Sequence, residues 1–407
     1  MFKIIALVLI GVTTLFQLFL FVRNILARKR PIPEEVSDVY DTEMYAKWKA
    51  YSSDQMKAKI ILTILNFALS FTLIITDVFA LVSANIANPY LSTLVVLGIY
   101  IGSFFILDAV FDYILKIKID GKYGFNKSST TTFIGDSVRK LIIMSILYIG
   151  LTMLFIVIYE AMKDYILILF SGVLIVFLFL IKILFPLLSK AANRFAPLEE
   201  GELRNRLMDM LTKNGYKIRD IKVMDASRRT TKSNAYFTGF GSTKTVVLFD
   251  NMLRTMSDDE IVAIFAHEIA HGLHKDSIKK SIMSYSLVIA LVVMTWLLVR
   301  FPQIYTDFGF TNVNYGFAVV LLFESVAPLI MRILNIPALI ISRRCEYKAD
   351  EFAAKQGYGD LLISSLKKLY KEDLGDVNPD PFVIALTYSH PTLAQRIRNI
   401  KKVNKKD

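Results

Sequence analysis

Three of the four histidines in this 407-residue chain fall inside eight residues. The segment His267-Glu268-Ile269-Ala270-His271 spells H-E-x-x-H, and His274 follows it. On a helix, positions i and i+4 share a face, so His267 and His271 can bind one metal ion, with Glu268 beside them to take a proton from metal-bound water. The pattern predicts a zinc hydrolase with one Zn2+ per chain. The alternative, a polar patch on an ordinary helix, leaves the concentration of histidine unexplained.

A catalytic zinc ion usually has three protein ligands and one open position for water, so a third ligand is needed. His274 is unsuitable, because position i+7 lies about 10.5 Å along the helix axis from His267. We expect it at the surface or behind the ligands. The metzincin pattern H-E-x-x-H-x-x-G-x-x-H also fails, since residue 277 is Ser. The third ligand must therefore come from elsewhere in the chain.

Two carboxylates four residues apart, Glu346 and Asp350, provide the best candidate for that ligand. On one helix face, Glu346 can bind zinc while Asp350 accepts a hydrogen bond from a ligating imidazole. The alternative is a solvated acidic face paired with Arg343 and Lys348. The H-E-x-x-H motif favours the metal-binding interpretation.

The chain has one cysteine, Cys345. A single cysteine excludes an internal disulfide and a Cys-rich zinc finger. Although Cys345 adjoins Glu346, we expect a small apolar side chain at a helix end rather than a thiolate ligand.

The composition indicates a membrane protein, since 54% of the residues are hydrophobic and the mean hydropathy is +0.47. Seven apolar stretches are long enough to cross the roughly 30 Å of bilayer hydrocarbon. They cover approximately Phe2 to Val22, Ile60 to Val82, Leu91 to Leu115, Leu141 to Tyr159, Tyr165 to Leu188, Ser281 to Val299 and Gly316 to Ile341. The first is too long for a signal peptide and lacks a cleavage site, so we expect a retained anchor.

Basic residues concentrate in alternate loops, which predicts the orientation. Lys and Arg follow the first, third and fifth stretches and fill the C-terminal tail, whereas residues 83–90 carry no positive charge. The N-terminus is therefore expected outside, and the C-terminus and catalytic domain in the cytoplasm. The net charge of +12 follows from this bias and from attraction to anionic lipid, so no nucleic-acid partner is expected.

The sequence divides into four parts. Residues 1–188 hold the first five membrane helices, 189–280 the first catalytic part, 281–341 two further membrane helices, and 342–407 the second catalytic part. Within 189–280 we expect a helix at 203–214, a strand at 221–225, a hairpin turning at Gly241-Ser242, and a helix starting at the capping box Ser257 to Glu260. The fold class is predominantly α: seven transmembrane helices plus a gluzincin-type metalloprotease domain with a small β-hairpin or sheet.

These motifs together resemble the integral-membrane zinc CAAX prenyl proteases. Besides the two metal motifs, the matching segments are Ser233 to Tyr236 with Gly239-Phe240, Tyr388-Ser389-His390-Pro391, and Lys122 to Lys127. The resemblance covers nearly the whole chain in the family's order. The HtpX-type membrane proteases share the catalytic motifs but have fewer membrane helices.

The resemblance implies a zinc metalloendopeptidase that cleaves near the C-terminus of prenylated or membrane-associated peptides and proteins. It also implies that His390 stabilises the oxyanion and that Asn234 and Ala235 bind the substrate backbone by strand addition. Arg396 is expected among the substrate-binding residues, supporting the same end of the site as His390. Pro391 suits a first helical position, so we expect His390 at a helix N-terminus.

The resemblance further implies a large water-filled chamber within the membrane helices. Six ionisable residues in the apolar stretches are either its lining or paired charges: Asp77, Asp108, Asp112, Lys182, Glu324 and Arg332.

Two other functions compete with this one. One is a quality-control protease of HtpX type, acting on misfolded or stalled membrane chains. The other is a non-catalytic transporter or receptor with a structural zinc, which the intact Glu268 disfavours because a structural site needs no general base. Residue usage rich in Ile and Lys favours a bacterial inner membrane, with the endoplasmic reticulum membrane as the location in a eukaryotic host.

Overall fold

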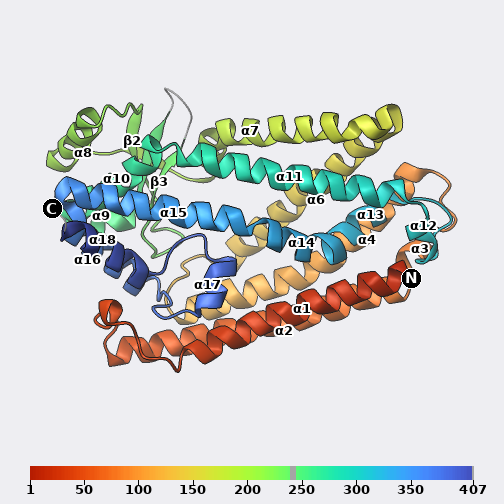
Figure 1. The fold of residues 1–407 in the computed structure, drawn as a ribbon, viewed down its shortest axis with the longest axis horizontal. Coiled ribbons are helices and arrows are strands. Elements are labelled where there is room, and N and C mark those ends of the chain that lie inside the picture. Colours follow the sequence, from red (N-terminus) through yellow and green to blue (C-terminus); the bar gives the residue numbers. More distant parts are fainter. Residues whose placement is uncertain (239–243, 406–407) are drawn as a thin grey trace.

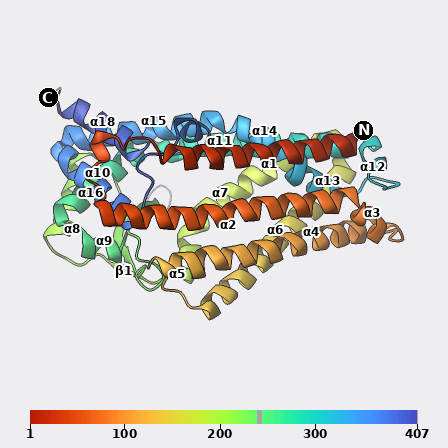
Figure 2. The same cartoon turned by 90° about the horizontal axis from the view of Figure 1, so that it is seen from below.

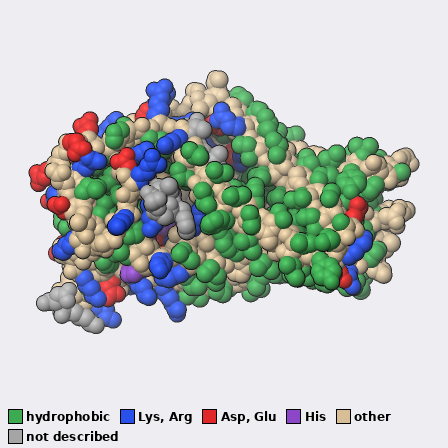
Figure 3. All heavy atoms as spheres, turned by 90° about the horizontal axis from the view of Figure 1, so that it is seen from above, with side chains coloured by type: hydrophobic (Ala, Val, Ile, Leu, Met, Phe, Trp, Pro, Cys, Tyr) green, Lys and Arg blue, Asp and Glu red, His purple; other side chains and the backbone are tan. Residues whose placement is uncertain are grey.

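The computed structural model describes residues 1–238 and 244–405 as an elongated molecule (Figure 1). Long helices fill the half that contains the N-terminus, and shorter helices with a small sheet gather at the opposite end. Figure 3 shows hydrophobic side chains covering most of the visible face, and charged side chains collected mainly at one end. The long helices are α1 (Phe2–Ala27), α2 (Thr42–Ile75), α4 (Pro89–Asp112), α6 (Thr130–Met162), α7 (Ile166–Ala192) and α11 (Asp276–Arg300).

In the described residues, six helical segments are long and apolar enough to span a membrane, whereas the sequence predicts seven. The difference lies in the segment Thr130–Leu187, which is 58 residues long. It contains both α6 and α7, with a single 3-10 turn at Lys163–Tyr165 between them. Figures 1 and 2 show α6 and α7 as two arms that meet at one end of the molecule.

The last spanning segment continues directly into the second catalytic part. Helix α13 (Tyr315–Leu321), a π-helical turn (Leu322–Val326) and α14 (Ala327–Leu334) succeed one another without a gap, and α15 (Ile336–Ala353) begins after Asn335 alone. The predicted boundary at Ser342, between the last membrane stretch and the second catalytic part, therefore lies inside α15, in a nearly unbroken helical rod. The predicted second stretch is also broken, because Asp77 adopts a left-handed conformation (φ 53°) and separates α2 from α3 (Val78–Ser83).

The ionisable residues of the apolar stretches fall into two groups. Asp108, Asp112 and Glu324 line a cavity of about 370 Å3 between the long helices. Within it, Glu324 accepts hydrogen bonds from Ser70 (2.5 Å) and Tyr100 (2.7 Å). The others are paired outside this cavity: Asp77 with Lys3, Lys182 with Ser281, and Arg332 with Gln17. Three of the six residues thus line one cavity, where Asp112 also pairs with Lys116 and Lys140, and the other three contact polar side chains elsewhere.

A four-stranded sheet lies beside α10 (Asp258–Leu273), in the order β1-β2-β4-β3. Its strands are β1 (Phe195–Pro197), β2 (Asp220–Met224), β3 (Ala235–Thr238) and β4 (Thr245–Phe249). Strands β3 and β4 pair antiparallel as predicted, although the expected Gly241-Ser242 turn and the matching Gly239-Phe240 lie outside the described residues. Strand β3 forms an edge of the sheet.

Helix α10 forms the centre of the hydrophobic core at the end of the molecule that holds the sheet. Ser257 accepts from the Glu260 backbone N–H, and the Glu260 carboxylate accepts from the Ser257 N–H, so the predicted capping box is present. Phe265 and Ile269 are almost fully buried in this core. The helices around it are α8 (Glu202–Lys213), α9 (Asp250–Thr255), α15, α16 (Gly359–Glu372) and α18 (Leu393–Asn404).

A buried carboxylate, Asp380, ties the first membrane helix to this core. Its side chain is 0% exposed and lies 3.0 Å from Arg23 and 2.9 Å from Arg30. It also caps α17 (Pro381–Thr387) by accepting from the Phe382 and Val383 N–H groups. Residues more than 340 positions apart are therefore held together by one side chain.

We expect Asp380→Ala to reduce the free energy of unfolding by about 2 to 3 kcal/mol, because it leaves two arginines unpaired and removes a helix cap. The matched control is Asp38→Ala. Asp38 also bridges the α1–α2 loop to the core, at 2.6 Å from Lys367, but is 64% exposed, so its loss should cost less than about 1 kcal/mol. Thermal unfolding of both purified variants measures the difference, and equal destabilisation would contradict it.

Candidate active site

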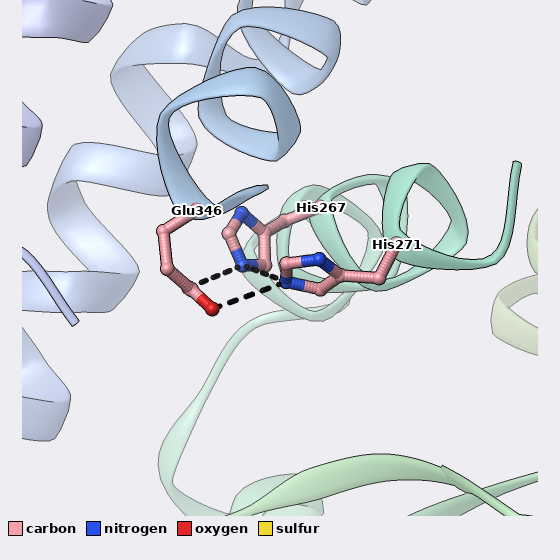
Figure 4. Close-up of side chains that lie close together, drawn as sticks. All are labelled: His267, His271 and Glu346. Carbon is pink, nitrogen blue, oxygen red and sulfur yellow. Dashed lines mark hydrogen bonds and ion pairs between the residues drawn. The ribbon is translucent and has the colours of Figure 1, made fainter. Parts of the chain in front are cut away.

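Two imidazoles from α10 and one carboxylate from α15 converge on one point (Figure 4). The Nε2 atoms of His267 and His271 lie 3.2 Å apart. The Glu346 carboxylate oxygens lie 3.4 Å from His267 Nε2 and 3.5 Å from His271 Nε2. His267 and Glu346 are buried, and His271 is half-buried. The structure thus brings together the three residues predicted as ligands.

The spacing of these atoms fits a tetrahedral metal site. Bonds of about 2.0–2.1 Å to a tetrahedral ion separate neighbouring ligand atoms by roughly 3.3 Å, close to the three distances observed. The ring orientation also fits, because each Nδ1 faces a carboxylate and each Nε2 therefore presents a lone pair. Two facing lone pairs and a carboxylate repel one another unless a metal ion or a proton lies between them.

The ligating imidazoles are oriented by two further carboxylates. His267 Nδ1 lies 3.0 Å from Asp350 Oδ1, the hydrogen bond expected from the sequence. His271 Nδ1 lies 2.9 Å from Asp276 Oδ2, at the start of α11. Asp276 is 2% exposed and is also held by Lys279. The sequence analysis missed Asp276, whose only signal was an acidic residue five positions after the second motif histidine.

Arg396 of α18 completes the inner layer of the site. Its guanidinium donates two hydrogen bonds to Asp350, at 2.6 and 2.9 Å, while its Nη2 atom lies 3.3 Å from His267 Nδ1. Asp350 is fully buried, and this bidentate pair compensates its charge. Arg396 therefore supports the site through Asp350.

Burial raises the pKa of Glu346 and Asp350, but their cationic neighbours outweigh it and lower the pKa of both carboxyls. Burial lowers the pKa of His267, but hydrogen bonds with Asp350 and Glu346 raise it to about 9. The two carboxylates thus favour a positive charge at His267. A proton supplies this charge in the absence of metal, and a bound divalent cation would supply it instead. Burial also raises the pKa of Glu268, which is the direction expected for a general base.

Glu268 faces a cleft of about 290 Å3 that opens beside the three convergent atoms. Asn234 and Ala235 line the same cleft, as do His390 and Lys280. Asn234 is exposed and immediately precedes the edge strand β3. An extended peptide in the cleft can therefore reach an edge of the sheet and Glu268 together. Lys280, 3.7 Å from Glu346, is a further cation that the sequence analysis missed.

His390 reaches the site, but not from the predicted position. Its Nε2 lies 3.4 Å from Glu346 Oε1, and its Nδ1 lies 2.9 Å from Ser389 Oγ. Helix α18 begins at Leu393 with Thr392 as its N-cap, so the expectation that Pro391 starts a helix at His390 is wrong. A Thr392–Gln395 capping box fixes the start instead, because it satisfies the first backbone N–H groups.

Arg343 holds the segment that carries His390. From α15, one turn before Glu346, its guanidinium donates to the backbone carbonyls of Ile384 (3.3 Å), Ala385 (3.4 Å) and Tyr388 (2.6 Å). The alternative role of Arg343 as a partner of Glu346 is thus not observed. His274 lies outside the cluster and packs edge-on against Phe352. The Cys345 thiol is buried on α15, and burial raises its pKa to about 11, which disfavours a thiolate ligand.

Comparison with known proteins matches both halves of the chain to described families. Residues 197–404 match peptidase family M48. Residues 21–190 match the CAAX prenyl protease N-terminal region, described as five membrane helices. The first match spans just over half of the chain.

Similar proteins cover nearly the full length. CAAX prenyl protease 1 homolog of Oryza sativa subsp. japonica is 28% identical over 408 residues, covering 96% of this chain and 95% of that protein. CAAX prenyl protease 1 of Saccharomyces cerevisiae is 28% identical over 409 residues, covering 92% and 89%. The crystal structure of S. mikatae Ste24p superposes with a TM-score of 0.88 at 26% identity, covering 98% and 99%. Together with the metal-binding geometry and the apolar helices, these matches show that the chain belongs to peptidase family M48 and is a multi-pass membrane metallopeptidase.

Proposed function

We propose that this chain is a zinc endopeptidase that hydrolyses peptide bonds near the C-terminus of prenylated or membrane-associated substrates. The observation that carries the proposal is the convergence of His267, His271 and Glu346 beside Glu268 in an open cleft. Two imidazoles and one carboxylate, with room for water, form the ligand set of gluzincin-type zinc peptidases. The similarity to CAAX prenyl proteases supports the substrate class.

Each residue of the site has a distinct role in the proposed hydrolysis. Bound zinc would polarise a peptide carbonyl and increase the acidity of a water molecule. Glu268 accepts the proton of that water and returns it to the departing amine. His390 faces the same point and donates a hydrogen bond to the carbonyl oxygen as it becomes negative. Asp350 and Asp276 keep both imidazole Nε2 atoms turned toward the metal position.

Substrate binding follows from the position of the cleft. The Asn234 side chain and the Ala235 backbone, at the start of β3, can bind an extended peptide, because β3 lies at an edge of the sheet. The near-continuous rod from α13 to α15 connects the membrane to Glu346. A prenyl group can therefore lie along apolar helices while the last residues of the peptide reach the cleft.

We further propose seven membrane crossings that enclose a water-filled chamber. Counting α6 and α7 separately gives five helices up to residue 190, in agreement with the description of the matched family. The cavity beside Glu324 and Asp108 supports a wet interior, because such groups are costly in hydrocarbon. The basic loops support a cytoplasmic catalytic end, in a bacterial inner membrane or, in a eukaryotic host, the endoplasmic reticulum membrane.

The metal assignment predicts a graded series of variants. Purified protein should contain about one zinc ion, which His267→Ala and Glu346→Ala should lose because a three-ligand site tolerates loss of a ligand poorly. Asp276→Asn should weaken zinc binding roughly 10- to 100-fold, since it only orients His271. His274→Ala is the matched control and should retain the metal. Metal analysis by mass spectrometry measures the series, and full zinc content in Glu346→Ala would move the third ligand elsewhere.

The general-base assignment predicts that Glu268→Gln keeps zinc and fold but loses about 10³-fold in peptidase activity, because an amide cannot accept the proton. Glu199→Gln, which removes an exposed carboxylate away from the cleft, should leave turnover unchanged. Peptide cleavage assays on zinc-replete protein test this. Near-normal turnover in Glu268→Gln would rule out the assignment.

The substrate assignment predicts cleavage of a farnesylated CAAX peptide in preference to its unprenylated twin. Asn234→Ala should reduce cleavage of all peptides alike, because the Asn234 amide would contact the backbone of the substrate rather than its side chains. The same assay should include an unstructured membrane-protein fragment. If active enzyme cuts the fragment but never the prenylated peptide, the proposed substrate class is wrong and the protein is a quality-control protease.

A further inference from the structure

A second polar cavity, of about 570 Å3, lies outside the cleft and plays no part in the proposed chemistry. Five cationic side chains and a single acidic one, Asp225, line it. We name it the basic pocket, defined by its cations Lys127, Lys190, Arg194, Arg228 and Arg229.

The cations of the basic pocket are poorly neutralised. Arg228 lies 3.8 Å from Asp225, and Arg229 lies 3.9 Å from Asp136, both at the outer limit of an ion pair. Within residues 1–238 and 244–405, no acidic side chain forms an ion pair with Lys127, Lys190 or Arg194. The pocket therefore carries an excess of positive charge that the chain itself does not compensate.

A second basic cavity shows that this is not general to the molecule. Near the C-terminus, Lys367 lies 2.6 Å from Asp38, and Arg398 forms a bidentate pair with Glu35. Acidic side chains of the α1–α2 loop thus pair closely with two of the five cations of that cavity, which three acidic side chains line in all. The basic pocket lacks such a partner and is the better place for an external anion.

The basic pocket lies where two membrane-spanning helices end. Ser129, which lines it, is the N-cap of α6, and Lys190 lies in the last turn of α7, three residues after the spanning segment ends at Leu187. The pocket therefore has one side toward the bilayer surface. Figure 3 shows Lys and Arg side chains gathered at the edge of the hydrophobic surface.

Exposed apolar side chains adjoin the pocket along both helices. Ile134 on α6 is 56% exposed, and Leu184 and Leu187 on α7 are 44% and 62% exposed. A ligand here would meet positive charge at one end and hydrocarbon-facing side chains at the other. The N-terminal end of α6, a helix of 33 residues, adds a favourable field for an anion.

We propose that the basic pocket binds the phosphate group of an anionic phospholipid, whose acyl chains lie along α6 and α7. Arginines bind phosphate oxygens in pairs of hydrogen bonds, and lysines add point charges. A net-negative headgroup matches the excess of cations better than a zwitterionic one. The bound lipid would brace the loop at Lys127 against the loop at Arg229, which already share a backbone hydrogen bond of 3.4 Å.

The test uses the full chain purified in an uncharged detergent, with lipid binding followed by native mass spectrometry. The probes are phosphatidylglycerol, phosphatidylcholine and soluble glycerol 3-phosphate. The test variant is Lys127→Gln/Lys190→Gln/Arg194→Gln. The matched control, Lys401→Gln/Lys402→Gln/Lys405→Gln, removes the same charge from the C-terminal helix and tail.

Wild type should bind phosphatidylglycerol in preference to phosphatidylcholine, and the test variant should bind it at least tenfold more weakly, since each cation near a membrane contributes about fivefold in affinity. The control should change by less than about twofold. Equal affinity for both lipids, or equal losses in both triple variants, would overturn the proposal. So would full displacement by glycerol 3-phosphate at equal concentration, which would indicate a site for soluble phosphate.

A second variant, Asp225→Asn, is expected to change lipid affinity in the opposite direction. Its result does not depend on whether the triple variant folds. Removing the one acidic side chain of the basic pocket should strengthen phosphatidylglycerol binding several-fold. Unchanged or weaker binding in this variant would contradict the assignment of the pocket to an anion.

Discussion

The site depends on the interaction of the fully buried Asp350 carboxylate with Arg396 and His267. A charge without solvent is costly unless it is paired, and Asp350 is paired from two directions, by the fork of Arg396 and by His267 Nδ1. The three residues come from α15, α18 and α10, so this one carboxylate fixes the relative positions of three helices. It also fixes the His267 ring, whose Nε2 must then face Glu346.

Two carboxylates of the site, Glu346 and Asp276, lie on helices that connect to the membrane. Glu346 is carried by the rod that leaves the bilayer through α14, and Asp276 opens α11, which enters it. Glu346 and the carboxylate that orients His271 are therefore both attached to long helices, and a site on packed helices is held more precisely than one on loops. Asp380 adds the first membrane helix to this framework through Arg23 and Arg30.

His390 differs from the other site residues in how it is held. It lies on a connecting segment and is mostly exposed, and its position depends on Arg343 from behind and on the capping of α17 and α18 at either side. The metal ligands lie on helices and are buried or half-buried, whereas His390 borders the open side of the cleft. This exposed position suits a residue that contacts the substrate rather than the metal.

The sequence by itself determined the chemistry and the local elements. Histidine spacing predicted the ligand helix, the Glu346–Asp350 spacing predicted which carboxylate would face the imidazoles, and apolar length predicted the membrane helices, because each of these signals is local and periodic. Capping at Ser257 was equally local.

Only the tertiary structure decided what depends on distant contacts. It placed Asp276 behind His271, Lys280 and His390 beside Glu346, and five cations around one pocket. It also showed where α18 begins, because a capping box at Thr392 outweighed the preference of Pro391 for a first turn. Hydrogen bonds and ion pairs between segments far apart leave no periodic trace in a sequence, so these partners become visible only when the chain is folded.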